Sequence, residues 1–178
     1  MTEASKAGVA LLDRIEASRF LGPEFLLWLW FESDRGGGRV AVAEDAFIEL
    51  WFEDALTLTD AATEVRLKAP TPTATPEAFE AVRQGKRPQV AKLRLTEGTQ
   101  SWVFTYRAET AGWSGVTVPT EFAGDEEEGF FERMRLLEAL EARWAELWAR
   151  FFALRTSCAW SRRVLPELRA WVTRGGPS

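Results

Sequence analysis

The chain has 178 residues, 46% of them apolar, and a formal net charge of −5 at pH 7. This length and apolar share suit one domain with a core, and argue against a wholly disordered chain. The acidic balance argues against a basic surface over the whole chain. The absence of histidine and the single cysteine exclude Ser-His-Asp and Cys-His catalysis, an internal disulfide and most zinc sites. We therefore expect no enzymatic activity, no metal and no cofactor.

The first 19 residues are expected to form an element of their own. Residues 1–19 place Val9, Leu12 and Ile15 at helical spacing with charged residues between them. This pattern predicts an amphipathic helix or a mobile arm. The segment lacks the apolar run of a signal peptide, and a lone cysteine suits a reducing compartment. We therefore expect a cytoplasmic protein in which residues 20–178 form a single domain.

The most apolar stretch of the chain is residues 20–31, FLGPEFLLWLWF. Gly22, Pro23 and Glu24 are typical of a helix start, and a glycine triplet after the stretch predicts the end of a helix over about 23–32. Apolar residues cover every face of this helix, so it should be buried on most sides. It is too short to cross a bilayer, which takes about 20 residues. No membrane partner is expected.

Between Arg39 and Val118 apolar and polar residues alternate in short runs, which predicts an antiparallel meander. A turn is expected at Glu53-Asp54, and a helix from Pro76 to Gln84 interrupts the strands. Val40 and Val42 alternate with small residues, and the expected strands then lie at Phe47–Phe52, Leu56–Thr59, Val65–Lys68, Val90–Leu95, Trp102–Tyr106 and Trp113–Val118. The sequence thus predicts a sheet of about six strands.

The longest predicted helix runs from about Glu126 to Arg155, with apolar residues every third or fourth position from Phe130 to Leu154. At about 1.5 Å per residue it would be about 45 Å long, more than a small domain needs. A last helix is expected over Val164–Thr173. Together these elements predict an α+β fold, in which an antiparallel sheet of about six strands packs with an aromatic N-terminal helix and a long C-terminal helix.

Basic residues gather in one part of this acidic chain. Residues 64–95 contain seven basic and three acidic residues. Phosphate groups need fixed positive charge but no particular base contact. The candidate DNA contacts are Arg83, Lys86, Arg87, Lys92 and Arg94. A second group of arginines lies between Arg150 and Arg174, and either group could instead pair with acidic residues of the same chain.

Nine tryptophans and twelve phenylalanines against one tyrosine indicate large buried surfaces or aromatic anchors at an interface. The candidate interface residues are Trp28, Trp30, Trp144, Trp148 and Phe151. The last three have helical spacing, which favours a seam between helices in the core, so both interpretations stay open.

A short helix at Glu77–Gln84 is followed by Gly85-Lys86, Val90, Lys92–Leu95 and the aromatic strand Trp102–Phe104. With this pattern, Thr75–Pro119 resembles the C-terminal part of the recombination-associated protein RdgC family. The opening FLGPEFLLWLWFESD is also similar to a segment ahead of this region in divergent relatives. The chain departs from the family in lacking its N-terminal portion and in its acidic charge.

The resemblance implies a non-enzymatic protein that binds duplex DNA without sequence preference, in recombination or nucleoid upkeep. Family members form ring-like dimers with a positive interior and restrain recombinase action. A second hypothesis comes from the tryptophans. In it the chain is a protein-interaction or dimerisation module that binds no nucleic acid.

Overall fold

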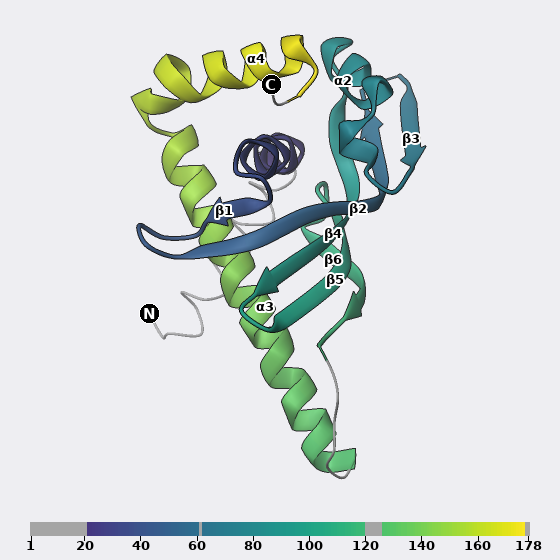
Figure 1. Ribbon diagram of the computed structural model, residues 1–178, viewed down its shortest axis with the longest axis vertical. Helices are drawn as coiled ribbons and strands as arrows, with labels where there is room; N and C mark the ends of the chain where they lie inside the picture. Colours follow the sequence, from purple (N-terminus) through teal and green to yellow (C-terminus); the bar gives the residue numbers. More distant parts are fainter. Residues whose placement is uncertain (1–20, 61, 120–125, 177–178) are drawn as a thin grey trace, which may run out of the picture.

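A computed structural model of the chain describes residues 21–60, 62–119 and 126–176. The element expected over residues 1–19 lies outside this part. Within the described residues, six strands form one antiparallel sheet, and the helices gather beside it (Figure 1). The predicted α+β fold is confirmed, including the aromatic helix and the long C-terminal helix.

The long strand β2 is the centre of the sheet. It pairs with β4 along one edge, and with β1 and then β3 along the other. The order continues from β4 to β5 and β6. The strands are β1 Arg39–Ala41, β2 Phe47–Thr59, β3 Glu64–Lys68, β4 Arg87–Glu97, β5 Gln100–Arg107 and β6 Gly112–Thr117.

The turn predicted at Glu53-Asp54 is wrong, because β2 continues through it. Phe52 is paired with Leu93 of β4, and Leu56 is paired with Ala91, with a register shift between the two pairs. The acidic residues lie in this bulge, where extra residues of one strand are accommodated without ending the ladder. The alternation stops locally at a bulge, so the sequence resembles a turn there.

The aromatic helix, residues 21–35, is the element around which the others pack. Every residue from 25 to 33 is buried, which confirms the predicted burial on all faces. The ring of Phe25 stacks on that of Trp148 with centroids 4.3 Å apart, and the ring of Trp30 lies 5.1 Å from that of Trp171. The helix is longer than predicted, since Gly22 and Asp34 lie inside it.

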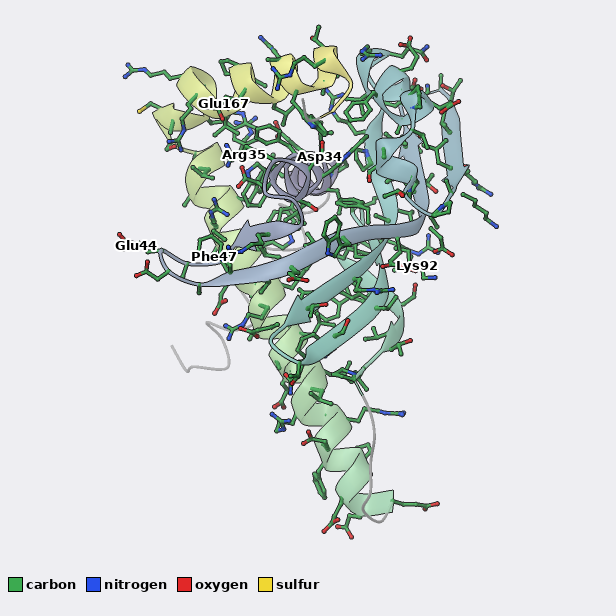
Figure 2. All side chains as sticks on the ribbon, in the orientation of Figure 1. Asp34, Arg35, Glu44, Phe47, Lys92 and Glu167 are labelled. Atoms are coloured by element: carbon green, nitrogen blue, oxygen red, sulfur yellow. The ribbon has the colours of Figure 1, made fainter. Side chains whose placement is uncertain are left out.

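The described residues form further helical segments beside the aromatic helix. They are a 3-10 turn Pro72–Ala74, α2 Pro76–Arg83, α3 Glu126–Arg155, a π-helical turn Trp160–Val164 and α4 Leu165–Arg174. The predicted cap of α2 is confirmed, because the Thr75 hydroxyl accepts a hydrogen bond from the backbone N–H of Ala78 at 3.3 Å. Figure 1 shows the aromatic helix end on, between the sheet and α4. Arg35 on this helix donates to Glu167 of α4 at 3.2 Å (Figure 2).

Candidate functional site

Lys86 does not lie on the surface as a DNA contact would. Only 5% of it is exposed, and its ammonium group donates to the Asp60 carboxylate and the Thr63 hydroxyl. The ammonium group and the backbone N–H groups of Ala62 and Thr63 hold the pKa of Asp60 far below its ordinary value. The prediction that Lys86 binds phosphate is therefore wrong, because its charge is buried and paired.

Two more of the candidate DNA contacts form ion pairs within the chain. Lys92 forms an ion pair with Asp54 at 2.9 Å, and Arg94 forms one with Glu53 at 2.8 Å. The hydrogen bond from Lys92 lowers the pKa of Asp54. Thus the acidic residues of the β2 bulge neutralise Lys92 and Arg94 of β4, on a side of the sheet where Figure 2 shows Lys92 at the surface.

The guanidinium group of Arg83 is bound to the end of α4. Its Nε donates to the Val172 carbonyl and an Nη donates to the Thr173 carbonyl, both at 3.2 Å. These carbonyls belong to the last turn of α4, where cations are favourable. Of the five candidates, only Arg87 makes no ion pair within the described residues; one of its Nη atoms donates to the carbonyls of Gly85 and Lys86. The predicted DNA site is thus largely neutralised.

All five aromatic residues predicted at an interface are buried in the chain's own core, none more than 6% exposed: Trp28, Trp30, Trp144, Trp148 and Phe151. Phe25 joins several of them, because its ring also packs 5.5 Å from that of Trp144 and 5.4 Å from that of Phe151. A partner could reach these rings only if the core opened. The interface prediction is therefore corrected to packing within the core. Four of these residues form a seam between the aromatic helix and α3, whereas Trp30 packs against Phe79 of α2 and Trp171 of α4.

Three of the six exposed large apolar side chains of the described residues lie at the start of α3, which the sequence did not single out as a site. Phe130 is 59% exposed, Phe131 62% and Met134 41%. We call residues 126–135 the α3 end. None of them is buried, and Figure 1 shows this part of α3 extending beyond the sheet. The apolar spacing had placed Phe130 and Met134 in one stripe with the core residues, and the structure corrects this.

In chain order, the buried residues of α3 begin at Leu136. This residue is only 2% exposed, and its carbonyl accepts a hydrogen bond from the Trp102 indole at 3.0 Å. The ten residues before it extend about 15 Å further. The predicted helix length of about 45 Å was the one signal in the sequence that this end would project.

The α3 end combines aromatic and acidic side chains. The rings of Phe130 and Phe131 lie edge to face with centroids 5.8 Å apart. Glu126 and Glu127 are exposed, and neither forms an ion pair with another described residue. The result is a protruding apolar surface with negative charge at its tip.

A groove of about 440 Å³ lies at the other end of the molecule, between the aromatic helix, α2, the π-helical turn and α4. We call it the α2/α4 groove. Arg83, Arg87 and Arg169 lie at this groove, whose one acidic residue, Glu24, is paired with Arg155 at 2.9 Å. Its apolar lining consists of Leu27, Val82, Trp160, Leu165, Leu168 and Val172. The groove is therefore apolar with an excess of positive charge.

In the part of the chain that the structure describes, no group of cysteine and carboxylate side chains is arranged to hold a metal ion. None of the described helices has the length and apolar character needed to cross a membrane. Comparison of the chain with family models, with curated proteins and with solved structures found no match. The resemblance to the RdgC family accordingly stays a prediction.

Proposed function

We propose that this chain is a cytoplasmic, non-enzymatic protein-interaction module whose contact surface is the α3 end. The observation that carries the proposal is the exposure of Phe130, Phe131 and Met134 on one projecting stretch of helix. Soluble domains rarely leave contiguous large apolar side chains in water without a use for them. Full burial of one such side chain contributes about 1.5–3 kcal/mol, so a partner that covers three of them gains substantially.

The core does not need these side chains. All the buried residues of α3 lie at Leu136 or after it in the sequence. A helix that served only to cover the sheet could begin near Leu136. The additional turns therefore support a role outside the fold.

The proposal is tested with a photoreactive phenylalanine analogue at position 131 of the full chain in cells, with position 152 as the matched control. Phe152 is another exposed phenylalanine of α3, 47% exposed, outside the α3 end. We expect a covalent adduct with a protein from position 131 and little or none from position 152. Equal yields from both positions, or none from position 131, would refute a contact through the α3 end.

A second candidate function is binding of duplex DNA, as the resemblance to the RdgC family implies. One observation favours DNA binding, but at arginines other than the predicted contacts. Arg162, Arg163, Arg169 and Arg174 are exposed, and none forms an ion pair with a described residue. Free arginines of this kind suit phosphate contacts.

Titration of random duplex DNA at low and high salt tests this second candidate. Binding should be strongest at about 50 mM salt and weaken as salt rises, because each phosphate contact releases counterions. Arg162→Glu with Arg174→Glu should weaken it, whereas Arg94→Glu, at a residue already paired with Glu53, should matter less. No binding at low salt would contradict DNA association.

A further inference from the structure

We infer that the α3 end of one copy of this chain binds the α2/α4 groove of a second copy. This inference rests on the proposed function and names the partner and its binding surface. The contact is head to tail, because the two surfaces belong to different parts of the chain.

The α3 end cannot reach the groove of its own chain. Trp160, which lines the groove, follows the C-terminal end of α3, whereas Phe131 lies near its N-terminal end. The part of α3 from Phe131 to its last residue, Arg155, is about 36 Å long and lies between them. Figure 1 shows α2 and α4, whose residues line the groove, at the opposite end of the molecule from the start of α3. An α3 end in this groove therefore comes from another copy.

The two surfaces are complementary in charge. The α3 end begins with consecutive glutamates, of which Glu126 and Glu127 are exposed and unpaired among the described residues. The groove presents Arg87 and Arg169, which likewise form no ion pair with a described residue. Opposite charges arranged in this way guide the encounter and fix the orientation of the complex.

The surfaces also match in their apolar character. The groove of about 440 Å³ falls within the roughly 300–1,000 Å³ of cavities that accept compact apolar ligands. Phe130 and Phe131 are the most exposed large apolar residues of the described chain, and Trp160 and Leu168 offer them an apolar floor. Aromatic side chains in an apolar pocket beside arginines are typical of the residues that dominate binding energy.

A head-to-tail contact leaves one free α3 end and one free groove in every dimer. Further copies can therefore add, and the product is a chain or, where the rotation closes, a ring. One projecting helix end buries less surface than a standard interface, which buries at least about 1,200 Å². Each contact is therefore weak. Assembly should thus depend on protein concentration and, because of its charges, on salt.

Two variants of the full chain test the inference by sedimentation velocity. The first, Phe130→Ser with Phe131→Ser, lacks the apolar α3 end but keeps its groove. The second, Arg87→Glu with Arg169→Glu, reverses the groove charge but keeps its α3 end. Arg162→Glu with Arg174→Glu is the matched control, since it changes the net charge equally outside the groove lining. Circular dichroism establishes that each variant is folded.

We expect the wild type and the control to form species larger than dimers as concentration rises. Each test variant alone should self-associate at least about tenfold more weakly. An equimolar mixture of the two should form a dimer and stop there, because one intact α3 end meets one intact groove. In a chain that carries the groove reversal, Glu126→Arg with Glu127→Arg should restore assembly.

Three results would overturn the inference. One is a wild type that stays monomeric at high concentration. Another is a groove variant that dimerises as well as the wild type, which indicates a symmetric contact between two α3 ends. The third is a cross-link from position 131 to a site outside the groove, or from the groove to residues 1–20 of the same chain. If position 131 instead captures a different protein, the proposed function stands and only the inference about a second copy fails.

Discussion

The ammonium group of Lys86 is buried against the carboxylate of Asp60, so that the chain segment before β4 is joined to the segment after β2. The Thr63 hydroxyl accepts a second hydrogen bond from the same ammonium group. Asp60 in turn accepts hydrogen bonds from the backbone N–H groups of Ala62 and Thr63. This small network gives the positive charge of Lys86 a structural role.

Asp60→Asn should destabilise the fold at pH 7, because it leaves the buried charge of Lys86 without its counter-ion. The pKa of Asp60 is lowered in the folded state. The Asp60 carboxylate therefore contributes its full stabilisation of the fold above the ordinary aspartate pKa of about 3.9. This contribution is lost as the pH falls toward the pKa of Asp60 in the folded state. Urea unfolding at pH 7 and at acidic pH should show the difference between wild type and variant shrinking in acid. Asp54→Asn, at the more exposed pair with Lys92, is the control and should have a smaller effect at pH 7.

Arg83→Ala should destabilise α4, because its guanidinium group no longer caps the carbonyls of Val172 and Thr173. Loss of a helix cap costs about 1 kcal/mol. Urea unfolding should show a decrease in unfolding free energy of about 1–2 kcal/mol. The unfolding free energy of Arg83→Lys, which keeps the charge but not both donors, should lie between those of the wild type and Arg83→Ala. An unchanged midpoint for Arg83→Ala would show that this contact does not stabilise α4.

Trp148→Ala should strongly lower the stability of the fold, whereas Phe131→Ala should weaken association and leave stability almost unchanged. Trp148 stacks on Phe25 in the core, so its truncation should lower the unfolding free energy by about 3–5 kcal/mol. Phe131 is exposed, so its truncation should change stability by no more than about 0.5 kcal/mol while it weakens association. A small loss for Trp148→Ala would contradict the core seam.

Much of the fold could be predicted because its signals are local. The burial of the aromatic helix follows from apolar residues on all its faces, and the start of α2 follows from Thr75 before a proline. The expected bounds of α3, Glu126 to Arg155, agree with the structure. The continuity of β2 through Glu53-Asp54 could not be predicted, because pairing with the distant strand β4 decides it.

The candidate surfaces were harder to predict from the sequence. Lys86 and Phe130 show why, since a lysine was expected outside and a phenylalanine inside. Lys86 is buried because Asp60, 26 positions away in sequence, comes to meet it. Phe130 is exposed because the contact with β5 begins only at Leu136. Apolar spacing along a helix tells which face is apolar, but it does not tell where the covering element ends.

Asp34→Asn should stabilise the protein at neutral pH. Burial raises the pKa of Asp34, against the lowering effect of the hydrogen bond from the Trp171 indole. A carboxylate with a raised folded pKa makes the fold less stable as pH rises through and above the ordinary value of about 3.9. Asparagine can accept the same hydrogen bond without a charge. Thermal unfolding between pH 3.5 and 7 should show an advantage of the variant that grows with pH, and a constant difference would contradict the effect of burial.

Amide hydrogen exchange of the full chain at low and high protein concentration tests the head-to-tail contact most directly. The α3 end has no buried residue, so its amides should exchange rapidly in the dilute monomer. At high concentration, exchange should slow in residues 126–135 and in the groove segments 82–87 and 165–173, while β1 keeps its rate. Exchange rates at the α3 end and the groove that do not change with concentration would contradict the contact.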